Sequence, residues 1–223
     1  MYHSGMRLIL ASASPRRATL LREAGYTFAV EPAHVDESES EGEAAPEYVI
    51  RVAALKGRTV AARFPDDIVL AADTTVVVDG VMLAKPADDA DAERMLHLLS
   101  GRAHEVLTGV VVIRAGVESS AVVATRVRFR PLDSAEVTWY VASGEPRDKA
   151  GGYGVQGLAA RFVESVEGSY TNVVGLPLSE VRHLLGAAGF APNGSEQPAA
   201  GQAPETFDRT GACGYSVEGR DVP

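Results

Sequence analysis

The sequence predicts an α/β protein, and three observations lead to this fold class. Strand-like and helix-like segments alternate through the first two thirds of the chain. The strand-like segment over residues 68–78 is apolar and β-branched except at three positions, as in a buried strand. The chain has 223 residues, of which 46% are hydrophobic, so it is long enough to bury one core of ordinary size.

The expected strands are apolar segments bounded by turn residues. Asp79 and Gly80 predict a hairpin turn between two of them, and Gly116 marks the turn between two others. In chain order, the expected strands cover residues 6–11, 26–31, 68–78, 81–85, 105–114 and 120–130, and a strand pair that turns at Gly168 covers residues 161–174.

The expected helices are identified by their ends. Ser14 is a suitable N-cap, Pro15 suits the first helical position, and Gly25 ends that helix. Asp133 and Glu136 have the spacing of a capping box. In chain order, the expected helices cover residues 15–24, 46–63, 88–100, 133–143 and 178–188.

Composition excludes several classes of protein. The net charge of -9 argues against general binding to nucleic acid or to acidic membranes. The single cysteine, Cys213, excludes an intrachain disulfide framework and a cysteine-rich metal site. No apolar run has the length of a signal peptide or a membrane span, so we expect a cytoplasmic protein. Residues 1–190 are expected to form the domain, and residues 191–223, rich in Pro, Gly and small polar residues, a disordered tail.

The start of the first helix has the features of a phosphate-binding site. An apolar strand leads into Ser12 and Ser14, and the free N–H groups of a helix N-terminus bind anions. Arg16 and Arg17 lie in the first turn, where the helix dipole disfavours cations, so their presence indicates a negative ligand. The alternative is a solvated turn whose arginines pair with surface carboxylates.

Asp73 is the main catalytic candidate. It lies within a segment that otherwise predicts a buried strand, where a carboxylate needs a cation or a donor to offset its desolvation. Unexplained buried ionisable groups cluster at functional sites. The alternative is a purely structural ion pair.

Four further residues are candidates for the site only when they are considered together. Glu37 offers the kind of oxygen ligand that magnesium prefers, although it lies in an acidic loop that by itself indicates a solvated surface. Lys56 and Lys85 could contact phosphates, and the amide of Gln156 could contact a base or fix its own loop. Taken singly, each lysine is more typical of an ordinary surface position.

Together, six motifs in this order resemble the Maf family of nucleoside triphosphate pyrophosphatases over residues 6–188. They are LILASASPRRATLL at 8–21, VDE at 35–37, AADT at 71–74, LAKP at 83–86, SGRAHEVLTGV at 100–110 and DKAGGYGVQG at 148–157. The resemblance implies an elongated mixed sheet flanked by helices, similar to inosine triphosphate pyrophosphatases. It also implies a cytoplasmic homodimer that cleaves a nucleoside triphosphate to monophosphate and pyrophosphate, with magnesium or manganese as cofactor. Such activity limits misincorporation of non-canonical nucleotides, and the family has been linked to arrest of septum formation.

The resemblance also implies roles for single residues. The family's catalytic acid corresponds to Asp73, and the branch that acts on dTTP and UTP is similar to this chain at Arg16, Thr74 and Gln156. Our hypothesis places a divalent metal on Glu37 and Asp73. The remaining substrate contacts are expected from Ser12, Arg16, Arg17, Lys56 and Lys85.

Two other functions stay open at this point. One is a nucleotide-binding regulator of septum formation in which hydrolysis is incidental. The other is an enzyme that prefers modified bases. Both alternatives also predict a nucleotide site. The regulator differs from the expected enzyme in turnover, and the second alternative differs from it in substrate preference.

Overall fold

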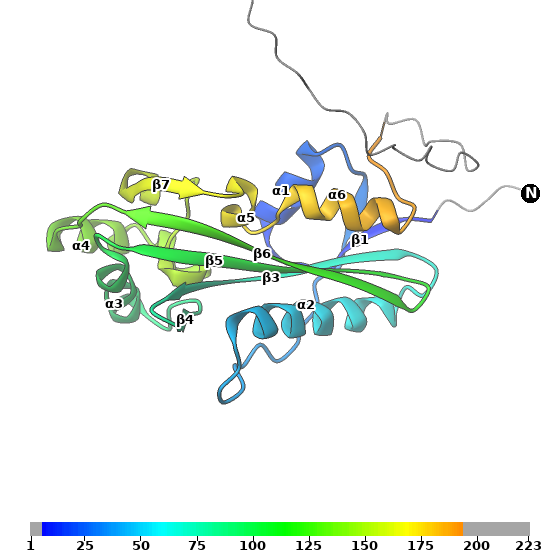
Figure 1. Ribbon diagram of the computed structural model, residues 1–223, viewed down its shortest axis with the longest axis horizontal. Helices are drawn as coiled ribbons and strands as arrows, with labels where there is room; N and C mark the ends of the chain where they lie inside the picture. Colours follow the sequence, from blue (N-terminus) through cyan, green and yellow to red (C-terminus); the bar gives the residue numbers. More distant parts are fainter. Residues whose placement is uncertain (1–5, 194–223) are drawn as a thin grey trace, which may run out of the picture.

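The computed structural model describes residues 6–193, and the centre of this part of the chain is a mixed sheet (Figure 1). Its seven strands are β1 (Leu8–Leu10), β2 (Phe28–Val30), β3 (Ile68–Val78), β4 (Val81–Leu83), β5 (Ala103–Arg114), β6 (Val117–Phe129) and β7 (Val163–Glu167). The order is β2-β1-β3-β5-β6-β7, and β4 pairs with β3. β2, β1 and β3 run parallel, whereas all the other pairs are antiparallel. The expected fold class, an elongated mixed sheet flanked by helices, is confirmed.

Helices cover both faces of the sheet, as Figure 1 shows. They are α1 (Pro15–Glu23), α2 (Ala45–Ala61), α3 (Asp89–Leu99), α4 (Ser134–Ala142), α5 (Tyr170–Val174) and α6 (Leu178–Ala187), with short 3-10 turns η1 (Glu145–Asp148), η2 (Ala150–Gly152) and η3 (Leu158–Phe162). α1 and α6 lie on one face, α2 lies on the other, and α3 and α4 lie at the end far from β1.

The side chains of β1 alternate between the two faces. Leu8 and Leu10 pack into the apolar cluster that includes residues of α1 and α6, whereas Ile9 packs into the cluster that includes residues of α2. All three are buried, as expected for a parallel strand covered on both faces.

Two glycines allow α2 to lie close to the sheet. A Cβ added at Gly109 of β5 would fall 2.5 Å from the carbonyl oxygen of Val49 in α2. A Cβ added at Gly57 of α2 would fall 3.1 Å from Cδ1 of Ile113. A glycine inside a helix costs roughly 1 kcal/mol relative to alanine. Here it permits the close packing that brings α2 over β3 and β5.

Most of the expected elements are confirmed within a few residues. The Asp79-Gly80 turn has positive φ at both positions, and the capping box of Asp133 and Glu136 is present. Glycine at 80 is therefore suited to its backbone conformation.

The predicted strand pair over residues 161–174 is wrong in its second half. Residues 163–167 form β7, but Tyr170–Val174 is the helix α5. The Ser169 hydroxyl accepts from the Asn172 N–H at 3.2 Å, and Gly175 ends the helix at φ +118°. The buried Asn172 amide also donates to the Val106 carbonyl oxygen at 2.9 Å. These caps and this tertiary contact outweigh the β-branched residues of the segment.

The start of the expected tail packs against the domain. The Asn193 N–H donates to the Gly25 carbonyl oxygen at 2.9 Å, and its side-chain amide donates to Thr27 Oγ1 at 2.6 Å. The rest of the expected tail, residues 194–223, which includes Cys213, lies outside the described residues.

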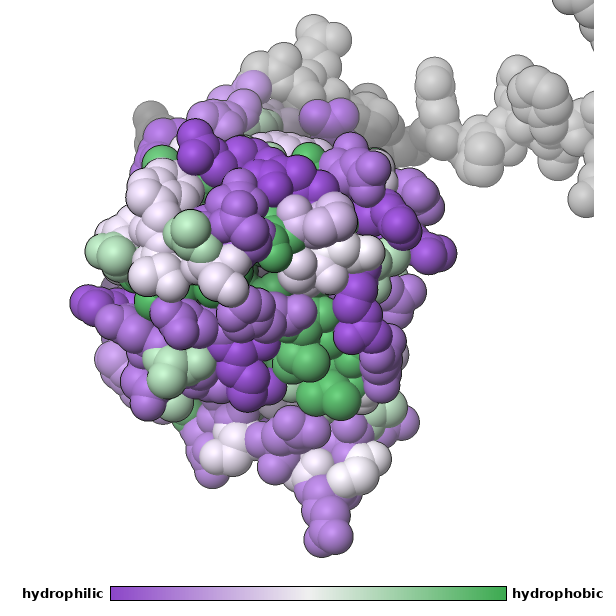
Figure 2. Space-filling model, turned by 90° about the vertical axis from the view of Figure 1, so that its left-hand side faces the viewer, coloured by the Kyte–Doolittle hydropathy of each residue, from purple (hydrophilic) through white to green (hydrophobic). Residues whose placement is uncertain are grey.

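The end of the molecule near α3 and α4 has a mainly hydrophilic surface. Figure 2 views the end near α3 and α4 and shows mainly hydrophilic residues around one hydrophobic area. No helix within residues 6–193 is both long and apolar enough to cross a bilayer.

Candidate active site

A cavity of about 760 Å³ opens where β1 ends and β3 continues beyond it. Because β1 and β2 run parallel, the segments that follow them emerge at the same edge of the sheet, where ligands bind in open α/β sheets. The cavity wall includes all the predicted site residues: Ser12, Arg16, Arg17, Glu37, Lys56, Asp73, Thr74, Lys85 and Gln156.

The loop between β1 and α1 has the predicted cap. The Ser14 hydroxyl accepts from the Arg17 N–H at 3.4 Å, and Pro15 is in the first turn. Ser12 is buried, and its hydroxyl accepts from the Ser14 N–H at 3.2 Å. The positive end of α1 therefore lies at the cavity wall.

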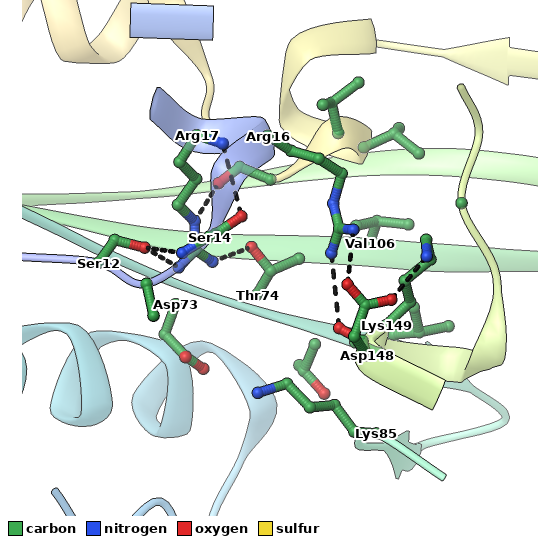
Figure 3. Close-up of a pocket in the computed structure, with 18 of the residues that line it drawn as sticks. Ser12, Ser14, Arg16, Arg17, Asp73, Thr74, Lys85, Val106, Asp148 and Lys149 are labelled. Carbon is green, nitrogen blue, oxygen red and sulfur yellow. Dashed lines mark hydrogen bonds and ion pairs between the residues drawn. The ribbon is translucent and has the colours of Figure 1, made fainter. Parts of the chain in front are cut away.

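The Arg17 guanidinium is hydrogen-bonded to the protein itself. It donates to Ser12 Oγ at 3.3 Å, the Ala72 carbonyl at 2.8 Å, Thr74 Oγ1 at 3.0 Å and the Gly175 carbonyl at 2.8 Å (Figure 3). Arg17 thus joins the first loop, β3 and the end of α5. Its charge still faces the cavity, but its N–H groups are largely committed to holding the wall together.

Arg16 contacts a carboxylate on the opposite wall. Its Nη1 donates to Asp148 Oδ2 at 3.0 Å, and Asp148 Oδ1 also accepts from Lys149 Nζ at 2.6 Å (Figure 3). Asp148 therefore lies between two cations that line the cavity. A bound phosphate would compete with Asp148 for both of them.

Asp73 is buried in the middle of β3, opposite Gly109 of β5. Its Oδ1 accepts from Lys56 Nζ of α2 at 2.7 Å. Its Oδ2 accepts no hydrogen bond from any other described residue. One oxygen thus offsets the cost of burial through an ion pair, and the other stays available to a ligand or water in the cavity.

Lys56 also contacts Glu37, at 2.9 Å from Nζ to Oε1. The surface position favoured for Lys56 taken singly is wrong, because its side chain lies buried between two carboxylates. Burial raises the pKa of Glu37, but the hydrogen bond from Lys56 and the charges of Lys56, Lys85 and Arg17 outweigh it and lower that pKa. Glu37 is therefore ionised at neutral pH.

Tyr48 fixes the backbone near Glu37. Its hydroxyl donates to the Glu37 carbonyl oxygen at 3.0 Å. Burial and the charges of Asp73 and Glu37 raise the pKa of Tyr48 to about 12, so the hydroxyl remains a donor at neutral pH.

The carboxylates fit a divalent metal that takes its other ligands from a substrate. Glu37 and Asp73 both contact the Lys56 ammonium group, so the two carboxylates lie close to each other, and Asp73 keeps one oxygen without a hydrogen bond from another described residue. Residues 6–193 contain no cluster of three or more His, Cys, Asp or Glu side chains that could hold a metal ion. Magnesium is commonly bound by one or two carboxylates together with substrate phosphates.

The remaining predicted residues line other parts of the wall. Figure 3 shows Lys85 with its ammonium group pointing toward the carboxylate of Asp73. The Thr74 hydroxyl shares a hydrogen bond with the Thr108 hydroxyl at 2.9 Å. Gln156 is exposed and makes no hydrogen bond with another described residue, so its amide is available to a ligand.

Some polar wall residues received no role from the sequence, among them Tyr48, Glu145, Asp148 and Lys149. Asp148 and Lys149 open the motif that ends in Gln156 and Gly157, and a charged pair before a glycine-rich segment was the signal available. Tyr48 and Glu145 belong to none of the six motifs, and their contacts with Glu37, Tyr140 and Leu158 depend on how the chain folds.

Comparisons with known proteins agree with the motifs. A family model described as Maf-like protein matches residues 7–188. A dTTP/UTP pyrophosphatase of Koribacter versatilis is 50% identical over 188 residues, covering 84% of this chain and 97% of the relative. A dTTP/UTP pyrophosphatase of Anaeromyxobacter sp. is 54% identical over 201 residues, covering 86% of this chain and 96% of the relative. Among solved structures, the Ham1 protein of Staphylococcus aureus matches at 16% identity and a TM-score of 0.41, covering 55% of this chain and 71% of that one.

Proposed function

Because this chain belongs to the Maf-like protein family, we propose that it hydrolyses dTTP and UTP to the nucleoside monophosphate and pyrophosphate. One structural observation carries the proposal beyond the names of its relatives. Asp73 is a buried carboxylate that faces a cavity beside Lys56, Lys85 and the start of α1. Such a cavity suits a polyphosphate and holds an acid next to it.

Asp73 is the residue that would activate water. Its Oδ1 is held by Lys56, and its Oδ2 can accept a hydrogen bond from a water molecule. The oxygen of this water attacks the α-phosphorus while its proton passes to Asp73. The bond from the α-phosphorus to the bridging oxygen breaks, and pyrophosphate leaves with that oxygen.

The cations around the cavity would neutralise the phosphates. Lys85 is exposed at the cavity wall, and Arg16 can exchange its contact with Asp148 for one with a phosphate. The Ser12 hydroxyl adds a donor, and the positive end of the α1 dipole adds a favourable field. Phosphoryl transfer depends mainly on such positioning and charge neutralisation.

Glu37 and Asp73 would hold magnesium or manganese. When bound, the metal supplies positive charge that offsets the charge of the phosphates and of the departing pyrophosphate. Lys56, which contacts both carboxylates, would help to orient them for the metal.

The uracil or thymine ring would meet the wall formed by Thr74, Gln156 and the residues near them. The Gln156 amide carries both a donor and an acceptor, which match the N–H and carbonyl groups shared by these two bases. Modified pyrimidines that keep these groups are further candidate substrates.

A nucleotide panel with magnesium tests the proposal. The protein is incubated with dTTP, UTP, dCTP, dGTP and modified nucleotides, and release of pyrophosphate and orthophosphate is measured separately. We expect pyrophosphate, fastest from dTTP and UTP. Release of orthophosphate alone would contradict cleavage at the α-phosphorus.

Asp73→Asn separates an enzyme from a regulator with incidental hydrolysis. We expect this variant to lose turnover while it still binds dTTP. Retained turnover would remove Asp73 from the mechanism. The homodimer, the cytoplasmic location and the link to cell division stay predictions, which sedimentation, cell fractionation and deletion of the gene would test.

A further inference from the structure

The loop that carries Gln156 lies against two side chains from the preceding turn. A Cβ added at Gly154 would fall 2.7 Å from Cε of Lys149. A Cβ added at Gly157 would fall 2.3 Å from Oε1 of Glu145. Glycine at these two positions therefore provides the space that Lys149 and Glu145 occupy, and the loop follows the shape of those side chains.

The Glu145 carboxylate joins this loop to a helix of the core. Its Oε2 accepts from the Leu158 N–H at 2.8 Å, and its Oε1 accepts from the Tyr140 hydroxyl at 3.0 Å. Tyr140 belongs to α4 and is fully buried. Hydrogen bonds to a carboxylate are stronger than those between neutral groups. Glu145 thus fixes the end of the loop to a buried side chain of α4.

The donor side of this contact is stable at neutral pH. Burial and the nearby charge of Glu145 raise the pKa of the Tyr140 phenol. The hydroxyl therefore keeps its proton and continues to donate to Glu145.

Gln156 has no comparable support of its own. Its side chain is exposed and has no hydrogen-bond partner among the described residues. The direction in which it meets a ligand is therefore set by the backbone between Gly154 and Leu158. A group held in place before binding loses less freedom when the ligand arrives.

We propose that Glu145 is a positioning residue that sets the nucleotide preference of this protein by holding the Gln156 loop. The inference rests on the proposed function, since it assigns Gln156 to the base. Glu145 does not touch the reacting atoms. It determines where Gln156 meets the base and how much room the base has at this wall of the cavity.

The test compares five variants with the wild type. They are Glu145→Ala, Glu145→Gln, Gly157→Ala, the double variant Glu145→Ala/Gly157→Ala and the control Glu164→Ala. Glu164 is an exposed carboxylate of β7 paired with Arg128, and it does not line the cavity. For each protein, kcat and KM are measured with dTTP and dGTP, and equilibrium binding of both nucleotides is measured in parallel.

Glu145→Ala is expected to lower the preference for dTTP over dGTP about tenfold, the equivalent of one hydrogen bond to a charged group. The change should appear mainly in the KM for dTTP. Glu145→Gln should keep most of the preference, because its amide can accept from the Leu158 N–H and donate to the Tyr140 oxygen. The control should match the wild type.

The Gly157→Ala variant tests in a second way whether the position of the Glu145 carboxylate sets the nucleotide preference. Gly157→Ala should also lower the preference, because its methyl group would displace the Glu145 carboxylate. In the double variant that carboxylate is absent, so the alanine should cause little further change. A purely structural role of Glu145 would lower thermal stability without altering the preference.

Two results would overturn the inference. One is an unchanged preference in Glu145→Ala, and the other is effects of Glu145→Ala and Gly157→Ala that multiply in the double variant. A wild type that binds dTTP selectively but releases no pyrophosphate would refute the proposed function, and the binding ratios would still test Glu145. If the wild type binds dTTP and dGTP equally well, the inference itself is refuted.

Discussion

Replacing Lys56 with methionine should destabilise the fold, because it leaves Asp73 as a buried carboxylate with no cation in contact. Lys56 is 8% exposed and Asp73 is 6% exposed. Removal of one partner from a buried pair costs about 3–5 kcal/mol, and we expect about 3 kcal/mol because Asp73 also faces the cavity. For a domain of this size, that corresponds to a fall in Tm of roughly 6–12 °C.

Urea and thermal unfolding at neutral pH measure this loss. Adding Asp73→Asn to Lys56→Met should recover most of it, since the unpaired charge is then absent. The matched control is Arg58→Met, on the same helix, where an exposed ion pair with Glu118 should contribute less than about 1 kcal/mol. The reasoning fails if Lys56→Met costs no more than this control, or if Asp73→Asn recovers nothing.

Three further predictions concern pH, packing and metal. Burial lowers the pKa of His104 from 6.5 to about 4, so the unfolded chain binds more protons between these values, and stability should fall by roughly 3 kcal/mol as pH decreases through this range. Urea titrations should show this dependence in the wild type and lose it in His104→Gln; equal slopes would contradict it. Gly109→Ala should lower the free energy of unfolding by about 1–3 kcal/mol, because the added methyl meets the α2 backbone at Val49, and a wild-type urea midpoint would refute the close packing. Glu37→Gln should raise the magnesium concentration for half-maximal rate about tenfold or more, whereas the exposed neighbour Asp36→Asn should not; similar rises in both would remove Glu37 as a ligand.

Local signals in the sequence were sufficient for most elements of the fold. The Ser14 cap, the Asp79-Gly80 turn and the capping box at Asp133 depend on neighbouring residues, and each is present in the structure. Residues 170–174 show where such signals conflict. Their β-branched side chains favoured a strand, but the cap at Ser169 and the buried contacts of Asn172 stabilise a helix.

The members of the candidate site were predicted, but their contacts were not. All nine predicted residues line one cavity. The pairing of Arg16 with Asp148 and the contact of Glu145 with the loop of Gln156 join segments of the chain that no motif relates to each other.

The sequence by itself determined most of the elements, their order and the residues available for chemistry, because caps, turns and hydrophobic periodicity act over a few neighbouring positions. The tertiary structure decided which charges meet. Lys56 lies between Glu37 and Asp73 only because glycines at 57 and 109 let α2 pack closely on the sheet. Arg17 contacts Gly175 only because α5 is a helix that ends beside the first loop. Contacts of this kind depend on how distant elements pack together, which a local pattern of residues does not specify.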